Sequence, residues 1–405
     1  MTSKTGGAEV GFGMLEFYAP RACYYNSRMA HEPDVLIVGG GVIGLTCAHS
    51  LARAGLRVEL LDKGDLGAEA SWAGAGIIPP GNPEKARTPY DRLRALSASL
   101  YPSISTELAE LTGIQNGYRV RGGVEFLQFG NDQIIRAWQS EGIAFRPLAP
   151  GALRELEPAV GAVPGTAFHL PGMAQVRNPR HLKALIAACR RLGVALCPQT
   201  QAVGWEIKDE RALSIRLTDG ARRPAGQFLI AAGAWADELL EPLECFAPIH
   251  PVRGQIVLLR CPASPFHSIL LRGKNYLVPR EDGRVLVGST EEAEAGFVKQ
   301  TTADAVAGLI HFAMETVPLL GEAEVERAWA GLRPGSADGM PYLGLVPGYG
   351  NIFVAAGHFR AGIQLSTGTA LLMTECMTGK RPSVPLDAFR PDREPACDYS
   401  PAFRS

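Results

Sequence analysis

The chain has 405 residues, of which 46% are hydrophobic and 20% are charged. A chain of this length is expected to fold into about two domains with a substantial buried interior. The formal net charge is -1, and no long block of like charges occurs. The sequence therefore argues against a nucleic-acid partner and against a surface that binds anionic membranes.

Eight cysteines are spread along the chain without a Cys-x-x-Cys pair or a cluster with metal-ligand spacing. Cysteines in apolar segments are usually small buried hydrophobic residues, so we expect a reducing, cytoplasmic location and no metal site. Residues 1–31 contain no apolar core of signal-peptide length, and glycines interrupt the apolar run at residues 35–48, so no membrane span is expected. Residues 1–32 are predicted to form a flexible extension, with Met29 as an alternative start.

A glycine-rich turn directly after the apolar run at residues 35–38 is the most informative motif. Gly39, Gly41 and Gly44 match the GxGxxG fingerprint of a dinucleotide-binding βαβ unit, and a helix is expected at residues 45–54. The first glycine allows a tight exit from the strand, the second lets backbone N–H groups approach a pyrophosphate, and the third lets the helix pack closely on the sheet. The phosphates would lie at the positive end of that helix.

An acidic residue supports the same interpretation. Asp62 follows the next apolar run, at residues 58–61. A carboxylate in this place accepts hydrogen bonds from both ribose hydroxyls, and its charge disfavours the 2′-phosphate of NADP. The alternative is a glycine-rich turn that binds no ligand. We favour nucleotide binding because the strand, the helix and the acidic residue are all present.

Similar strand-to-helix units return in the middle and near the end of the chain. Residues 227–235 and 351–357 are apolar strands that end on small residues, and an apolar helix is expected at residues 363–378. Residues 123–129 instead alternate as a half-buried strand does. Further helices are expected at residues 93–111, at residues 178–192 with Asn178 as the N-terminal cap, and at residues 303–317.

We therefore predict an α/β protein in which a discontinuous Rossmann-like nucleotide-binding domain is interrupted by a β-rich α+β substrate domain. The nucleotide-binding domain is predicted at residues 33–85, 172–246 and 328–381, the substrate domain at residues 86–171 and 247–327, and a C-terminal tail at residues 382–405.

A second glycine-flanked loop, at residues 357–362, favours a flavin over a nicotinamide. It joins a predicted strand to the helix that begins near Ile363. A helix start directs backbone N–H groups and positive dipole at a bound group, and a reduced flavin carries negative charge at N1 and the C2 carbonyl. The alternative is a tight turn without a ligand. We favour FAD, bound non-covalently because no cysteine lies in a motif where a covalent flavin link is expected.

Five segments resemble a known family: residues 38–44, 70–79, 251–255, 331–344 and 355–363. They are similar to the D-amino acid oxidase family of flavoproteins, and within it most similar to the glycine oxidases of thiamine biosynthesis. The resemblance implies two-electron oxidation of the amine of glycine or a small amino acid by FAD. The imine then hydrolyses to a 2-oxo acid and ammonia, and molecular oxygen reoxidises the flavin to give hydrogen peroxide. It also implies a homo-oligomer, since relatives are commonly oligomeric.

The expected cofactor contacts follow from the glycine turn, from Gly233 at the end of a buried strand, and from the resemblance. The resemblance implies a backbone contact of Val176 near the adenine and contacts of residues 358–364 with the isoalloxazine ring. The complete set is Gly39, Gly41, Val42, Ile43, Gly44, Asp62, Lys63, Ala70, Ser71, Ala75, Gly76, Ile77, Val176, Gly233, His358, Phe359, Arg360, Ala361, Gly362, Ile363 and Gln364.

Hydride transfer from Cα requires a substrate held in place by its carboxylate, and a planar guanidinium binds both carboxylate oxygens at once. Arg333 is the candidate, because a purely structural arginine would be costly to bury in its glycine-flanked apolar segment. The resemblance implies the same role, and it implies Arg360 and Tyr276 as further substrate contacts. A structural arginine that binds backbone carbonyls and a packed strand tyrosine remain the alternatives for these two.

No acid or base is assigned, since hydride transfer from a neutral amine needs no strong base; His358 is expected to bind backbone or flavin instead. Lys274 and Glu291 depart from the family pattern. Each is either a pocket-wall residue that alters substrate choice or a solvated surface charge. Two other functions stay open: a D-amino acid dehydrogenase that passes electrons to a quinone, and a non-catalytic flavin-binding assembly protein.

Overall fold

The computed structural model of the protein describes residues 32–128, 132–394 and 403. Nearly all of the extension predicted at residues 1–32 lies outside these ranges, as do Cys23 and Cys397. Within the described ranges, none of the helices combines the length and the apolar composition that crossing a membrane requires.

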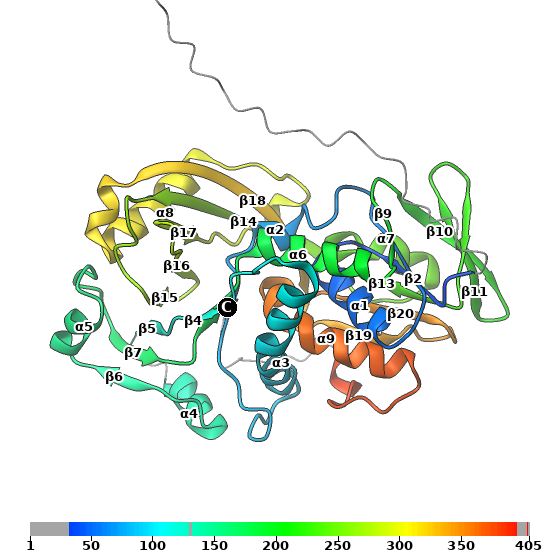
Figure 1. The fold of residues 1–405 in the computed structure, drawn as a ribbon, viewed down its shortest axis with the longest axis horizontal. Coiled ribbons are helices and arrows are strands. Elements are labelled where there is room, and N and C mark those ends of the chain that lie inside the picture. Colours follow the sequence, from blue (N-terminus) through cyan, green and yellow to red (C-terminus); the bar gives the residue numbers. More distant parts are fainter. Residues whose placement is uncertain (1–31, 129–131, 395–402, 404–405) are drawn as a thin grey trace, which may run out of the picture.

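A six-stranded sheet forms one half of the molecule, on the right in Figure 1. Its order is β19-β20-β13-β1-β2-β9, and every neighbouring pair is parallel except β19 with β20. Val35 and Ile37 of β1 face one core and Leu36 faces another, which explains why this strand is apolar throughout. The strands are β1 (Val35–Val38), β2 (Val58–Leu61), β9 (Ala195–Cys197), β13 (Gln227–Ile230), β19 (Tyr342–Leu345) and β20 (Ile352–Ala356).

Four helices cover one face of this sheet and share one hydrophobic core with it. They are α1 (Val42–Arg53), α3 (Pro89–Thr112), α6 (Asn178–Arg191) and α9 (Gly362–Met377). A small antiparallel sheet and a short helix pack on the opposite face. These elements are β10 (Ala202–Lys208), β11 (Arg211–Leu217), β12 (Arg222–Pro224) and α7 (Asp237–Leu240).

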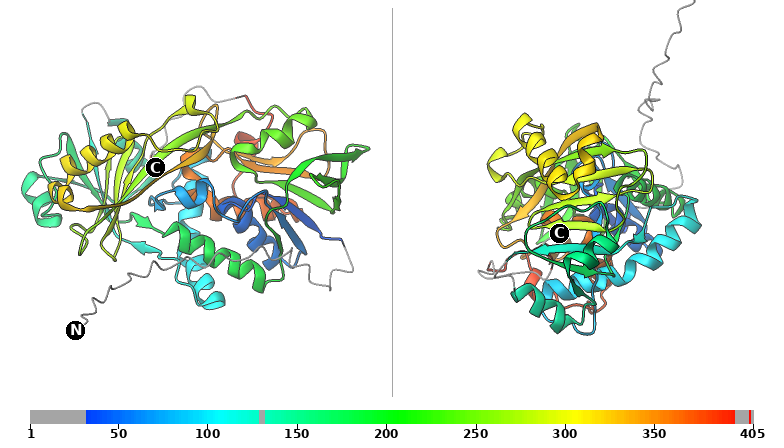
Figure 2. Two further views of the ribbon diagram at one scale, coloured as in Figure 1. Left: turned by 90° about the horizontal axis from the view of Figure 1, so that it is seen from above. Right: turned by 90° about the vertical axis from the view of Figure 1, so that its left-hand side faces the viewer.

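An eight-stranded sheet, on the left in Figure 1, forms the other half of the molecule. One face packs against α8 (Ala303–Thr316), which lies along the sheet in Figure 2. The other face carries a separate apolar cluster that includes Tyr276 and Ile256. In order, the strands are β18 (Glu324–Ser336), β14 (Ile249–Arg260), β17 (Arg284–Gly288), β16 (Asn275–Pro279), β15 (Ile269–Arg272), β5 (Gly123–Leu127), β7 (Thr166–Leu170) and β6 (Arg146–Leu148).

Short elements connect the two halves. A three-stranded sheet pairs β3 (Ile77–Ile78) and β4 (Arg119–Val120) with β8 (Ala174–Gln175). The remaining elements are α2 (Ala70–Ala73), α4 (Asp132–Glu141), α5 (Pro150–Leu156), η1 (Gly233–Trp235), η2 (Glu241–Leu243), η3 (Ala293–Ala295), η4 (Pro318–Glu322), η5 (Phe359–Ala361) and η6 (Asp387–Phe389).

The predicted α/β class is confirmed by the two sheets and their helices. Two segments contact elements on both sides of the predicted domain boundaries. The helix α3 lies within residues 86–171, yet its apolar side joins the core of the six-stranded sheet. The strand β18 overlaps residues 328–381, yet it pairs along its length with β14 in the eight-stranded sheet. Helix periodicity and strand alternation do not reveal which sheet an element joins. The division into a nucleotide-binding and a substrate domain stays a prediction.

One local expectation also differs from the structure. Asn178 is the first residue of α6 rather than its cap, and its side-chain amide donates to the Ser71 carbonyl at 2.8 Å. In the described part of the C-terminal tail predicted at residues 382–405, Phe389 is fully buried and Arg393 forms an ion pair with Asp338 at 2.8 Å.

Candidate active site

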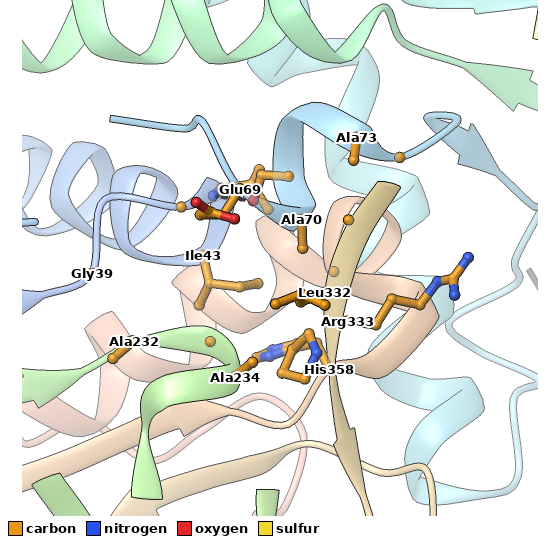
Figure 3. Close-up of a pocket in the computed structure, with 18 of the residues that line it drawn as sticks. Gly39, Ile43, Glu69, Ala70, Ala73, Ala232, Ala234, Leu332, Arg333 and His358 are labelled. Atoms are coloured by element: carbon orange, nitrogen blue, oxygen red, sulfur yellow. Dashed lines mark hydrogen bonds between the residues drawn. The ribbon is translucent and has the colours of Figure 1, made fainter. Parts of the chain in front are cut away.

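A long cavity lies where the carboxyl ends of the parallel strands meet the eight-stranded sheet. The cavity contacts the face of that sheet that carries Tyr276 and Ile256, which we call its inner face. Its walls come from the β1–α1 turn, the segment around α2, the ends of β13 and β20, and parts of β14, β16 and β18. In Figure 3, Gly39 lies at one end of the labelled residues and Arg333 at the other. Segments that are distant in the sequence thus enclose one extended space, as the predicted discontinuous fold requires.

Most of the predicted site residues line this cavity. They are Gly39, Gly41, Val42, Ile43, Asp62, Lys63, Ala70, Ser71, Ala75, Gly76, Ile77, Gly233, His358, Phe359, Gly362, Ile363 and Gln364, together with the substrate candidates Tyr276, Arg333 and Arg360. Five predicted residues are not among the lining residues: Gly44, Val176, Lys274, Glu291 and Ala361. The backbone N–H of Val176 donates to Gly76 and its carbonyl accepts from Arg280.

The glycine turn has no room for side chains. Gly39 has φ +112°, and a Cβ on it would lie 2.3 Å from the Ala231 carbonyl oxygen. A Cβ on Gly44 would overlap the carbonyl oxygen of Gly39, which confirms the close approach of α1 to the turn. The first residues of α1 therefore reach the cavity with their backbone, and the Val42 N–H donates to Ser71 Oγ at 2.9 Å.

Asp62 is held by two backbone groups. Its two carboxylate oxygens accept from the N–H of Gly40 at 2.6 Å and of Gly64 at 2.7 Å. Burial raises the pKa of Asp62, and these two hydrogen bonds oppose the rise. Each oxygen retains a further lone pair, so the carboxylate can also accept a hydrogen bond from a ligand hydroxyl.

The start of α9 gives the cavity a second helix N-terminus. Gly362, Ile363 and Gln364 line the cavity, and the first N–H groups of a helix lack partners within it. The side chains of α3 fix this helix start: Tyr101 Oη donates to the Ile363 carbonyl, and Ser97 Oγ donates to the Gln364 carbonyl at 2.6 Å. Two positive helix ends and a side-chain-free turn in one elongated cavity fit a diphosphate cofactor that also carries negative charge at a distant ring.

His358 is buried next to this helix start, and its ring Nε2 lies 3.0 Å from Thr369 Oγ1. Burial lowers the pKa of His358 to about 3. The imidazole is therefore neutral at physiological pH.

Arg333 extends from β18 across the inner face of the eight-stranded sheet. Its Nη1 donates to the Thr290 carbonyl at 3.1 Å and its Nη2 to Ser289 Oγ at 2.8 Å. The guanidinium lies flat on Gly254 of β14, where a Cβ would be 2.1 Å from both terminal nitrogens. Burial lowers the pKa of Arg333, but a guanidinium stays charged in proteins. A cation is thus fixed at one end of the cavity.

Tyr276 lies against a second glycine of the same sheet face. A Cβ on Gly288 would lie 2.5 Å from the Tyr276 hydroxyl oxygen, so the ring also rests directly on backbone. We call Gly254 and Gly288 the glycine floor. It determines how deep both side chains lie.

Arg360 already has two partners in the protein. Its Nη1 forms an ion pair with Glu291 at 2.9 Å, and its Nη2 donates to the Lys274 carbonyl at 2.9 Å. The Lys274 side chain itself is exposed. Glu291 is therefore in contact with a cavity-lining arginine although it does not line the cavity.

Sequence reasoning missed several residues of the site. Arg280 is buried and donates to the Ala75 carbonyl at 2.6 Å and to the Val176 carbonyl at 3.0 Å, so it joins the eight-stranded sheet to the segment around β3. Burial lowers its pKa to about 9. Other missed lining residues are Glu69, Ala73, Trp235, Glu238, Gly254, Ile256, Ser289, Gly331 and Leu332. Gly254, Gly331 and Leu332 lie in the segments that resemble the family, whereas no pattern marks Ser289.

Comparison with known proteins identifies the family. Residues 34–376 match the model of the family described as FAD dependent oxidoreductase. The chain belongs to the FAD dependent oxidoreductase family. The predictions of an FAD-dependent oxidoreductase and of a D-amino acid oxidase type fold are thereby confirmed.

Known proteins are similar to this chain over most of its length. The glycine oxidase of Pseudomonas aeruginosa is 36% identical over 364 residues, which cover 88% of this chain and 98% of the relative. The bifunctional protein ThiO/ThiG of Synechocystis is 34% identical over 90% of this chain and 54% of the relative. The crystal structure of the glycine oxidase from Geobacillus kaustophilus superposes with a TM-score of 0.84 at 32% identity, covering 90% of this chain and all of the other.

Proposed function

We propose that this protein is an FAD-dependent oxidase of glycine and other small amino acids that supplies thiamine biosynthesis. Its products are the imine, which hydrolyses to a 2-oxo acid and ammonia, and hydrogen peroxide. The position of Arg333 carries the proposal: a fixed guanidinium lines the same cavity as the start of α9. The similarity to glycine oxidases and to a ThiO/ThiG protein supports it.

The predicted cofactor contacts are proposed to hold FAD. The glycine turn and the start of α1 would hold the diphosphate, Asp62 the ribose, and the start of α9 the flavin ring, which matches the two helix N-termini in the cavity. When bound, FAD supplies a two-electron acceptor that oxygen can regenerate.

Arg333 would bind the substrate carboxylate. Its guanidinium has five N–H groups, of which the Thr290 carbonyl and the Ser289 hydroxyl use two. Among the described residues, no carboxylate lies within ion-pair distance of it. The free N–H groups can bind both oxygens of a carboxylate, which fixes the orientation of the Cα–H bond. The hydroxyl of Tyr276, in the same cavity, would donate to that carboxylate as well.

The chain would not supply a general base. His358 is a neutral, buried imidazole beside Thr369, and hydride transfer from a neutral amine needs none. The protein residues would therefore act by binding, orienting and excluding water rather than by proton transfer.

Anaerobic reduction tests the proposal. The purified protein should show an FAD spectrum that bleaches with glycine, sarcosine, D-alanine or D-proline, and it should form hydrogen peroxide when air is admitted. Bleaching without peroxide, together with fast reduction of a quinone or dye, would instead establish a dehydrogenase. If none of the four amines bleaches the flavin, the oxidase proposal fails and a non-catalytic flavin protein remains.

We also propose a cytoplasmic location, a homo-oligomeric state and the two-domain division. Among the described cysteines, Cys47, Cys189, Cys245, Cys261 and Cys376 are free thiols, which fits a reducing compartment. Light scattering on the eluting protein tests the oligomeric state, and limited proteolysis tests the domain division.

A further inference from the structure

We propose that the Arg360–Glu291 ion pair is a charge filter that restricts the enzyme to substrates with a single carboxylate. The inference rests on the proposed function, because it concerns which amino acids reach Arg333. In this arrangement Glu291 forms an ion pair with Arg360, the second arginine that lines the cavity. Arg333 alone then keeps an uncompensated charge for a substrate anion. Glu291 thereby determines specificity without binding the substrate.

The ion pair connects both halves of the molecule at the cavity. Arg360 belongs to η5, directly before the start of α9, whereas Glu291 follows the end of β17. Arg360 also donates to the carbonyl of Lys274, in the turn between β15 and β16. The Arg360 side chain is only 12% exposed and the Glu291 side chain 38%, so the pair lies between the cavity and solvent.

The charges close to the cavity end support a filter. Arg360 lowers the pKa of Arg333 and Glu291 raises it, after the larger lowering by burial, so all three side chains act on one another electrostatically. Glu292 also raises this pKa, but it forms an ion pair with Arg253. Together, Arg333, Arg360 and Glu291 carry one net positive charge. This charge matches the single carboxylate of the substrate.

Among the described residues at this end of the cavity, a second carboxylate would meet no cation whose charge is uncompensated. Glu291 balances the charge of Arg360, whereas the two partners of Arg333 are neutral, and the negative charge of Glu291 repels a further anion. Repulsion between like charges at a partly buried site is an efficient way to exclude a wrong ligand. An amino acid that carries an extra carboxylate is therefore excluded although it can offer the same α-carboxylate to Arg333.

Substrates in matched pairs test the filter. D-alanine and D-aspartate differ by one carboxylate, and so do sarcosine and iminodiacetate. In the wild type, kcat/KM should strongly favour the first member of each pair. The variant Glu291→Gln keeps the size of the side chain but removes its charge, and it should shift this preference toward the dicarboxylate by about tenfold or more, the scale of a single charge interaction outside bulk water.

Two further variants separate charge from structure. Glu294→Gln alters an exposed glutamate in the nearby η3 and should leave the preference unchanged. Glu291→Ala also removes the hydrogen bond to Arg360 and should shift the preference in the same direction as Glu291→Gln. Added salt should weaken the wild-type discrimination, because ions screen a partly exposed charge.

A binding experiment tests the filter without turnover. Acetate and malonate should perturb the flavin spectrum when they bind near Arg333, and the wild type should bind acetate more tightly than malonate. Glu291→Gln should reverse or abolish that order. If Glu291→Gln and wild type show the same acetate-to-malonate ratio, the filter is refuted whatever the activity. Absence of flavin reduction by every amine, with the binding shift intact, would refute the proposed function and leave the filter standing.

Discussion

The glycine floor allows the position of Arg333 to be altered without touching its charge. In a Gly254→Ala variant the new Cβ would lie 2.1 Å from both terminal nitrogens of Arg333, whereas nonbonded carbon and nitrogen atoms stay roughly 3.4 Å apart. The guanidinium must therefore move by about 1 Å or more. Because it is the far end of a flexible side chain, the backbone of β14 and the fold should remain intact.

The expected effect follows from the bonds that would be lost. A hydrogen bond between charged groups contributes about 1.5–3 kcal/mol, so losing one of the two bonds to a substrate carboxylate lowers kcat/KM about 10- to 200-fold. The assay is steady-state peroxide formation with glycine, together with flavin content and the melting temperature. Gly308→Ala is the control, since nothing lies within 4 Å of a Cβ there and alanine favours the helix α8.

Two outcomes would contradict this reasoning. Wild-type kcat/KM in a fully flavin-loaded Gly254→Ala protein would show that the observed position of Arg333 is not required. A collapse of flavin content and melting temperature together would show that Gly254 serves the fold rather than the guanidinium. The control should retain both activity and stability.

Three further predictions concern the cofactor and the sheet. Gly44→Ala should yield protein largely without flavin, measured by its absorbance ratio, because the Cβ would overlap the Gly39 carbonyl; full flavin content would contradict this. Arg280→Met should weaken FAD binding and lower the melting temperature, since the buried Ala75 and Val176 carbonyls each lose a donor at a cost of about 1–3 kcal/mol; an unchanged dissociation constant would argue against the link. Burial raises the pKa of Glu125 to about 7 from 4.5. Between these two pH values the folded chain keeps a proton that the unfolded chain releases. The free energy of unfolding therefore falls by up to about 3 kcal/mol as the pH rises from 4.5 to about 7. Glu125→Gln should lose this decrease in urea unfolding at pH 5 and pH 8; equal pH dependence in both proteins would show that Glu125 is not responsible.

The parts of the site that were predictable are local in sequence. The β1–α1 turn and Asp62 belong to one βαβ unit, whose glycines and acidic residue have fixed offsets, and the strand β1 has the bounds expected from its apolar run. Arg333 was predictable because burying a charge is costly, so its apolar surroundings required a ligand or a partner.

The unpredicted parts depend on contacts between distant segments. Arg360 and Glu291 are 69 positions apart, and only the arrangement of β17 against the start of α9 brings them together. Gly254 supports Arg333 because β14 and β18 pair in one particular register, which alternation of apolar residues does not specify. The position of α3 had the same difficulty, since its apolar side fits a helix against either sheet.

Through the two hydrogen bonds from Arg280, binding of the cofactor should raise the stability of the contact between the two halves of the molecule. They hold the end of β16 to the backbone around β3, the segment whose residues 75–77 line the cavity proposed to bind FAD. A ligand that orders this segment stabilises the contact between the two sheets by mass action, by about 2.7 kcal/mol at a hundredfold excess over its dissociation constant. Riboflavin supply during expression should therefore set how much of the protein survives cellular proteases, even before any substrate is oxidised.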